Sequence, residues 1–334
     1  MLYYWGIIYH REDTKMIFLS IIIPVYNAAY WLGGCLDSLL STIPDMNAVQ
    51  IILVDDGSTD GSGAICDQYA QQCSAIQVIH QANGGVSAAR NTGLMHVQGE
   101  YIAWVDPDDY VSSDWFSSIR SAILSCHPDV VVFDTRRFDV HEETQEIYGR
   151  TPGLIDMDLF LTDLYRDARM LSGLPNKVIR AKHFSGVSFD TELTVLEDFA
   201  AMPKIMSRAT SVYYIPKTLY HYRQHGASLL HRADSQRAFS SFRTACARVA
   251  EVPDRYRTVA KTCAAMQAFA YCYHHCATPD FNAKPEHLRQ CKGYMLRQLP
   301  AICADKELTA FMKLKYALML TGITRMKYLP KRGT

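Results

Sequence analysis

Five continuous apolar runs, separated by segments of helical length, constrain this 334-residue chain more than any other feature. Runs that do not alternate with polar residues are typical of strands covered on both faces of a parallel sheet. The β-α-β-α order predicts a doubly wound, mainly parallel α/β sheet with right-handed crossovers. The runs lie at 18–26, 50–56, 76–80, 100–106 and 129–134, and the helical segments at 28–41, 61–73, 86–97 and 114–126.

Polar residues follow three of these predicted strands, at 24–27, 55–58 and 106–109. In a doubly wound sheet the ligand site lies beyond the carboxyl ends of the strands, although capping and turn formation also use such residues. Neither a G-x-G-x-x-G motif after the first strand nor a P-loop motif occurs, which disfavours a dinucleotide or P-loop site.

Three carboxylates, those of Asp106, Asp108 and Asp109, fall within four positions after the fourth run. Like charges at this range repel, and a turn or helix cap needs only one of them. A bound Mg²⁺ or Mn²⁺ would turn the repulsion into coordination. The residues themselves leave both a divalent-cation site and a turn open.

Charge and cysteine content narrow the class of protein. The 34 basic and 34 acidic residues cancel, so nothing global favours nucleic acid. Ten cysteines without a C-x-x-C pair indicate reduced thiols in a cytoplasmic protein.

Residues 16–36 carry no charge over a length that spans a bilayer, but Pro24, Tyr26 and Asn27 divide them into a strand and a helix start. Residues 1–15 lack the charge order of a signal peptide, and we expect an N-terminal extension.

Four stretches resemble, in the same order and spacing, the signatures of family-two glycosyltransferases with the GT-A fold. The match covers about residues 17 to 115, and a weaker one through 174–184, 195–206 and 219–230 resembles acceptor-side motifs of bacterial capsule and exopolysaccharide enzymes. The four stretches read "SIIIPVYNAAYWLGGCLDSLL", "IILVDDGSTDGS", "QANGGVSAARNTGL" and "YIAWVDPDDY".

The resemblance implies a nucleotide-sugar donor, most often a UDP-sugar, an acceptor hydroxyl on a glycan or lipid-linked glycan, and inversion at the anomeric carbon. It implies that Asp55 accepts from the uracil N3–H, beside a base and ribose pocket shaped by Pro24, Tyr26 and Asn27. Asp56 has another reading, in which it closes the turn with Ser58 and caps the next helix.

The resemblance also assigns the diphosphate and the metal. Gly84 and Gly85 would let the backbone approach the ligand and aim a helix N-terminus at anionic groups. Arg90 would contact the diphosphate or form an ion pair with a site aspartate. In the family's D-x-D motif, Asp108 corresponds to a metal ligand and Asp106 to a contact with the ribose or the metal. Asp109 would support the metal ligands or cap a helix.

On the acceptor side, the resemblance makes Asp198 of "LEDF" the base that deprotonates the acceptor hydroxyl. Glu197, one residue away on a helix, would point about 100° elsewhere. A solvated helix face is the alternative for both. Lys177 could contact donor or acceptor or lie on the surface, and Pro175 stands where the family commonly has an aromatic residue.

In "HYRQH", His221 and His225 have the spacing of a zinc pair on a helix. The resemblance instead implies that Arg223 or His225 reaches the diphosphate, with His225 also a candidate metal ligand.

The last hundred residues predict helices at 235–250, 257–277, 286–303 and 307–322. Their late basic residues form either a solvated helix end or a peripheral contact with an anionic membrane surface. We therefore expect an extension (1–15), a donor-binding half (16–125), an acceptor-side catalytic half (126–234) and a helical region (235–334). The basic residues are Lys313, Lys315, Arg325, Lys327, Lys331 and Arg332.

The residues alone leave two other classes of protein open, a nucleotidyltransferase and a sugar-nucleotide-binding module. A nucleotidyltransferase also uses metal carboxylates, but it carries a Gly-rich signature with Arg and Lys after the first strand, which "PVYNAAYW" lacks. A sugar-nucleotide-binding module without catalysis need not keep Asp108 and Asp198 together, whereas this chain has both.

Overall fold

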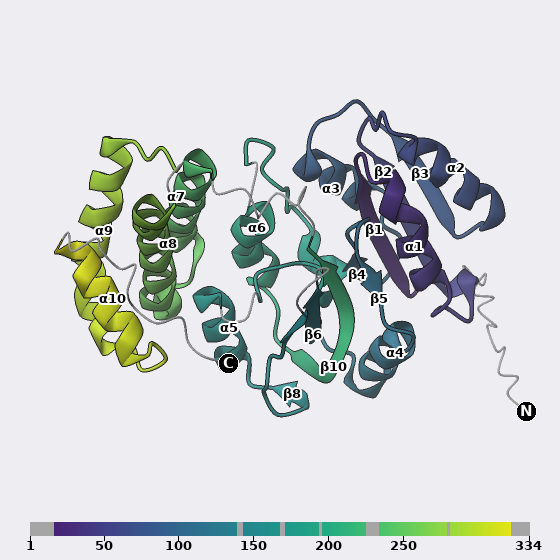
Figure 1. The fold of residues 1–334 in the computed structure, drawn as a ribbon. Coiled ribbons are helices and arrows are strands. Elements are labelled where there is room, and N and C mark those ends of the chain that lie inside the picture. The colour runs from purple at the N-terminus through teal and green to yellow at the C-terminus, as the bar shows by residue number, and fades with distance from the viewer. Residues whose placement is uncertain are drawn as a thin grey trace, which may run out of the picture.

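The computed structural model describes residues 17–138, 143–167, 171–193, 196–224, 234–278 and 281–321 (Figure 1). The strands are β1 (Leu19–Val25), β2 (Val49–Asp55), β3 (Ile76–His80), β4 (Tyr101–Trp104), β5 (Tyr110–Val111), β6 (Val130–Phe138), β7 (Glu143–Glu146), β8 (Gly153–Ile155), β9 (Lys177–Arg180) and β10 (Val212–Arg223). The helices are α1 (Ala29–Leu40), α2 (Ser62–Gln72), α3 (Val86–Met95), α4 (Trp115–Cys126), α5 (Met157–Arg166), α6 (Glu197–Met206), α7 (Ser235–Glu251), α8 (Arg257–Ala277), α9 (Pro285–Ala304) and α10 (Ala310–Leu320).

The strands form one sheet in the order β3-β2-β1-β4-β9-β6-β10-β5, with β7 beside β6 and β8 beside β10. Strands β1 to β4 pair in parallel, and Val25 at the end of β1 lies opposite Asp55 at the end of β2. The predicted α/β fold class is therefore confirmed, and the predicted strands and helices of this half agree within a few residues with those observed.

The apolar runs are continuous because both faces of the sheet are covered. Ile21 and Ile23 of β1 pack into a core with α1 and α4, whereas Ile22 between them packs into a second core with α3, α5 and α6. All seven residues of β1 and all seven of β2 are buried. The stretch 16–36, long enough to span a bilayer, is divided between β1 and α1 as expected.

The second half of the sheet mixes strand directions. Strand β9 is antiparallel to both β4 and β6, which lie on either side of it. Strand β10 runs parallel to β6 and antiparallel to the short β5, so that His221 pairs with Tyr110. This pairing places the end of β10 beside the aspartates at 106–109. The alternative of a zinc pair on a helix is wrong, because residues 212–223 are strand; His225 lies outside the described residues.

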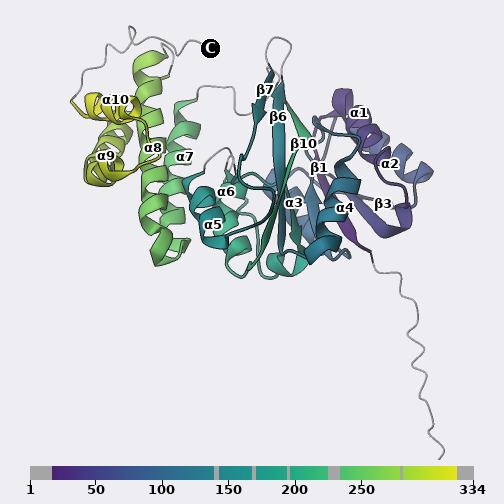
Figure 2. The ribbon, with the colours of Figure 1, turned by 90° about the horizontal axis from the view of Figure 1, so that it is seen from below.

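Helices α7 to α10 pack around a separate apolar core and gather at the opposite end of the molecule from β3 and α2 (Figures 1 and 2). In this region Lys313 donates a hydrogen bond to the Cys303 carbonyl, and Lys315 lies over the Phe311 ring. The four later basic residues of the predicted membrane-contacting end lie outside the described residues. Within the described part of the chain, no helix combines the length and apolar character needed to cross a bilayer.

Candidate active site

The carboxyl ends of β1 and β2 hold a network centred on Asp55. Its buried carboxylate accepts a hydrogen bond from the Ser58 N–H at 3.0 Å and lies 2.8 Å from His80 Nδ1. Burial alone would raise the pKa of the Asp55 carboxyl, but the hydrogen bonds from Ser58 and His80 lower it below its usual value. The other ring nitrogen of His80 lies 3.1 Å from Asp67. Asp55 is therefore a fixed, ionised acceptor at this edge.

The three predicted pocket residues of β1 differ in what they present. Tyr26 is half exposed beside the strand end, so its ring face is available to a flat ligand. Asn27 adopts a left-handed backbone conformation (φ 47°) and its side chain accepts from the Thr59 N–H at 2.8 Å. Pro24 is buried within β1, so it contributes to the packing of the strand and is not exposed at this edge.

Asp56 does not cap the following helix, in contrast to one sequence reading. Its carboxylate accepts hydrogen bonds from the backbone N–H groups of Gly84 and Gly85 at 2.9 and 2.8 Å, and from the Gln81 side chain at 2.7 Å. A side chain on Gly84 would bring its Cβ within 2.8 Å of the Ala88 Cβ. Asp56 thus holds the glycine turn against the end of β2 and occupies the two amide donors that we expected a ligand to use.

Arg90 connects residues predicted for the donor side and for the acceptor side. Its buried guanidinium forms a salt bridge with Glu197 and lies 3.7 Å from Asp106. The guanidinium also lies over the rings of Trp104 and Phe189, at 5.9 and 5.7 Å. Arg90 therefore forms the predicted ion pair with a site aspartate, and it brings residues 106 and 197 into one site.

The three aspartates after β4 have different surroundings. Asp109 is buried and accepts from the Tyr220 hydroxyl at 2.6 Å and from the Arg223 N–H at 2.7 Å, so it ties β10 to this loop and does not cap a helix. Burial and the neighbouring carboxylates raise its pKa well above the usual value. The Asp106 side chain is 27% exposed, and burial with the charges of Asp108 and Glu197 raises its pKa to about 6 against the opposing effect of Arg90.

A divalent cation fits this surplus of negative charge. Among the residues that the structure describes, no three His, Cys, Asp or Glu side chains are grouped to hold a metal by themselves. Mg²⁺ and Mn²⁺ sites commonly take only one or two carboxylates and complete their ligand set with substrate phosphates and water. Asp106 and the partly buried Asp108 could supply those two carboxylates, whereas Asp109 is committed to Tyr220 and Arg223.

Arg223 completes the loop around Asp108. Its Nε donates to the Asp108 carbonyl at 3.0 Å, and its guanidinium lies over the rings of Trp31 and Phe138 at 4.4 and 4.8 Å. His221, two residues earlier, is buried with its Nε2 2.8 Å from the Ser112 hydroxyl. A guanidinium held by aromatic faces beside the aspartates is well placed to meet an anion.

Glu197 and Asp198 open helix α6. Leu196 precedes them with φ 62°, an uncommon conformation for a large side chain, and it sets the direction in which the helix starts. Glu197 is buried against Arg90, so a solvated helix face is wrong for this residue. Asp198 is partly buried, and burial together with the Glu197 charge raises its pKa to about 7, against the opposing charge of Arg90.

Two buried cations, Lys177 and Arg248, lie near Asp198. The sequence left Lys177 open as a surface residue and did not single out Arg248. Lys177 is fully buried and donates to the Gly173 carbonyl at 2.6 Å, so the surface reading is wrong. Burial lowers its pKa to about 7, and the charges of Asp198 and Asp167 oppose that change. Arg248 of α7 is 3% exposed and lies 3.8 Å from the centre of the Phe199 ring. No motif marks Arg248, because only the packing of α7 on α6 brings it here.

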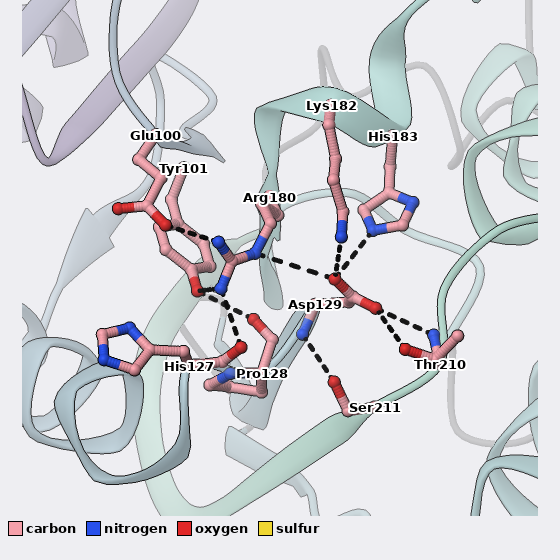
Figure 3. Close-up of polar contacts among 10 residues, drawn as sticks. All are labelled: Glu100, Tyr101, His127, Pro128, Asp129, Arg180, Lys182, His183, Thr210 and Ser211. Atoms are coloured by element: carbon pink, nitrogen blue, oxygen red, sulfur yellow. Dashed lines mark hydrogen bonds and ion pairs between the residues drawn. The ribbon is translucent and has the colours of Figure 1, made fainter.

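A second polar cluster lies at the opposite, amino-terminal edge of the sheet (Figure 3). Asp129, before β6, contacts Lys182 at 2.8 Å and His183 at 3.1 Å, and accepts from the Thr210 N–H and hydroxyl. Burial alone would raise the pKa of Asp129, but these contacts hold it well below its usual value. The cluster joins the starts of β6 and β10 to the end of β9, so it is a structural element away from the candidate site.

Comparison with known proteins identifies relatives of this chain. Residues 20–192 match the family model described as glycosyl transferase family 2. The glycosyltransferase GlyA of Streptococcus pneumoniae is 31% identical over 222 residues, which cover 63% of this chain and 31% of GlyA. GlyG of the same species is 30% identical over 221 residues, which cover 64% of this chain and 72% of GlyG. The chain thus spans about a third of the length of GlyA and most of GlyG.

The fold is also similar to a solved structure. The crystal structure of residues 1–349 of S. aureus TarS in complex with UDP-GlcNAc superposes with a TM-score of 0.68 at 18% identity, covering 92% of this chain and 91% of that one. The shared fold therefore extends into the helical region. Since the family model matches 173 of the 334 residues, and GlyG is related over most of its length, this chain belongs to glycosyl transferase family 2.

Proposed function

We propose that this protein is an inverting glycosyltransferase that moves a sugar from a UDP-sugar to a hydroxyl of a glycan or lipid-linked glycan. The observation that supports it most is the buried bridge in which Arg90 contacts Asp106 on the donor side and Glu197 on the acceptor side. Since Asp198 adjoins Glu197, this bridge brings the donor carboxylates and the candidate base into one site, and a two-substrate displacement needs both reactants held close together. GlyA and GlyG are named as glycosyltransferases, and the similar TarS structure holds UDP-GlcNAc.

The donor would lie along the carboxyl ends of β1, β2 and β4. Asp55 is ionised and already fixed by two partners, and a carboxylate has about four acceptor positions, so it retains capacity for the uracil N3–H. Tyr26 offers an exposed ring beside it. A divalent cation held by Asp106 and Asp108 would supply charge that stabilises the departing diphosphate. Arg223, beside Asp108, adds a second positive charge on that side.

Asp198 would act as the general base. The acceptor oxygen attacks the anomeric carbon from the face opposite the diphosphate, and its proton passes to the Asp198 carboxylate. The bond between the anomeric carbon and the diphosphate oxygen breaks, and its electron pair leaves with UDP. A carboxyl with a pKa of about 7 can take a proton during the reaction and return it to water afterwards.

A donor screen tests the proposed function. We expect a UDP-sugar with Mn²⁺ to raise the midpoint of thermal unfolding, because a ligand that binds only the folded state stabilises it by mass action. The measurement compares UDP-sugars and GDP-sugars, each with Mn²⁺ and with EDTA. Protection by no nucleotide sugar under either condition would contradict the proposal.

Replacing Asp55 by Ala should weaken UDP binding by roughly 1.5–3 kcal/mol, or about 10- to 150-fold, because a hydrogen bond to a charged acceptor is lost. The dissociation constant is measured by isothermal titration. Asp67→Ala is the matched control, because Asp67 also contacts His80 but lies exposed on α2 and should leave UDP affinity unchanged. Parental affinity in a folded Asp55→Ala protein would show that the uracil assignment is wrong.

A further inference from the structure

A pocket of about 400 Å³ lies between α7 and α9, on different elements from those that form the candidate donor site. Its charged lining is entirely basic and consists of Arg243 from α7 and Arg289 and Arg297 from α9. Within the described part of the chain none of the three guanidinium groups forms an ion pair, and that of Arg297 lies 5.8 Å from the centre of the Tyr294 ring. Three exposed arginines that line one pocket without carboxylate partners match an anion with several oxygens, above all a phosphate group.

The remaining lining suits a sugar or polyol next to that phosphate. Phe242 is buried and meets Tyr294 edge to face, with ring centres 5.4 Å apart, so Tyr294 is supported from within the helical core. Gln290 adds an amide that can donate to or accept from a hydroxyl. Aromatic faces beside hydrogen-bonding side chains are typical of ligand pockets with a few oriented polar groups.

Gly293 leaves this pocket open. It lies inside helix α9, where glycine is less stable than alanine by roughly 0.5–1 kcal/mol. The backbone does not require it, because a Cβ at this position would meet only Arg297 Nη1, at 3.7 Å. The glycine is therefore not needed for the backbone conformation, and its lack of a side chain leaves volume in the pocket. A longer side chain would extend into that volume.

The pocket is connected to the start of α6 through one layer of apolar side chains. Two of its lining residues, Cys246 and Tyr294, pack against a small cluster that contains Phe199, the residue after Asp198. Leu196, two residues before Asp198, packs on the same cluster. The pocket and the start of α6 therefore adjoin the same apolar cluster, where α6 and α7 lie next to each other (Figure 1).

We propose that the pocket is an acceptor subsite that binds a phosphate group carried by the acceptor, with the adjoining sugar or polyol against Tyr294. The inference rests on the proposed function, because it names the chemical class of the acceptor of the same site. A phosphodiester-linked polyol chain and a lipid pyrophosphate share this chemistry, and the experiment separates them.

The test titrates the full chain in EDTA with two probes, a glycerol phosphate trimer and geranyl pyrophosphate, and with unphosphorylated glycerol as the neutral control. We expect one phosphate probe to bind, and Arg289→Gln with Arg297→Gln to weaken it by about 10- to 100-fold, because two charge-assisted contacts are lost. The charge-matched control is Lys284→Gln with Lys306→Gln, two exposed lysines that do not line the pocket. It should change the affinity less than about threefold, since it alters only the screened long-range attraction.

A second pair of variants tests the pocket itself without changing charge. Gly293→Leu should weaken the bound probe at least about tenfold by filling the pocket, whereas Gly293→Ala, whose Cβ fits, should bind as the parent does. Binding of neither phosphate probe, or equal losses in the arginine and lysine variants, would overturn the subsite and leave a solvated helix face. UDP affinity is measured in parallel, so failure of the donor site and failure of the pocket appear as separate results.

Discussion

Asp198→Asn is expected to lower kcat by roughly 10²–10⁴-fold while leaving the fold and the UDP dissociation constant unchanged, because general-base loss affects the proton transfer and not donor binding. In the proposed mechanism the aspartates after β4 act on the donor side, and Glu197 is held by Arg90. Asp198 is the adjoining carboxyl whose surroundings raise its pKa to about 7. The measurement is kcat together with the UDP dissociation constant.

The pH dependence of turnover provides a second reading of the same prediction. The base is active when deprotonated, so kcat/KM should rise with pH through about 7 and then level, and Asp198→Asn should lack that limb. Lys177→Met removes a buried positive charge that favours ionised Asp198, so the limb should move to higher pH.

Glu197→Gln is the contrasting variant. Glu197 balances the buried charge of Arg90, so its loss should weaken donor binding or stability and not only the chemical step. Near-parental turnover in Asp198→Asn, or a larger loss of kcat in Glu197→Gln with UDP binding intact, would place the base elsewhere.

Asp108→Asn is expected to weaken binding of UDP in the presence of Mn²⁺ on the order of 10²-fold, because one of the two carboxylates available to the cation is lost. Isothermal titration measures the effect directly. Asp114→Asn is the matched control, since this nearby carboxylate is exposed and pairs with Lys217. Equal losses in the two variants would indicate a general electrostatic effect and not a metal ligand.

The first half of the fold could be predicted from the sequence because its strands are buried on both faces. Each of β1 to β4 follows from a continuous apolar run, and the polar turns after β1, β2 and β4 mark their carboxyl ends. Strand β9 gave no comparable signal. It has four residues, begins with a lysine, and exists only because β4 and β6 lie on either side of it.

In the candidate site, too, local motifs mark individual residues, whereas contacts between residues distant in the sequence cannot be predicted from it. The residue types at 55, 90, 106, 108 and 198 carry chemistry that a motif can mark. Their connection cannot be seen from spacing, since Arg90 and Glu197 are 107 positions apart. Arg248 and Lys177 were missed or misread because burial, and not residue type, gives them a role beside Asp198. The helix-cap alternative for Asp56 is wrong because its partners, Gly84 and Gly85, lie 28 and 29 residues away.

Titration of the unmodified protein with UDP, once with Mn²⁺ and once with excess EDTA, tests the donor site most directly. Binding is expected to be at least about tenfold tighter with Mn²⁺, because a cation held by Asp106 and Asp108 would attract the diphosphate and offset the mutual repulsion of the two carboxylates. Equal affinity for UDP under the two conditions would contradict a metal-dependent donor site at the carboxyl edge of this sheet.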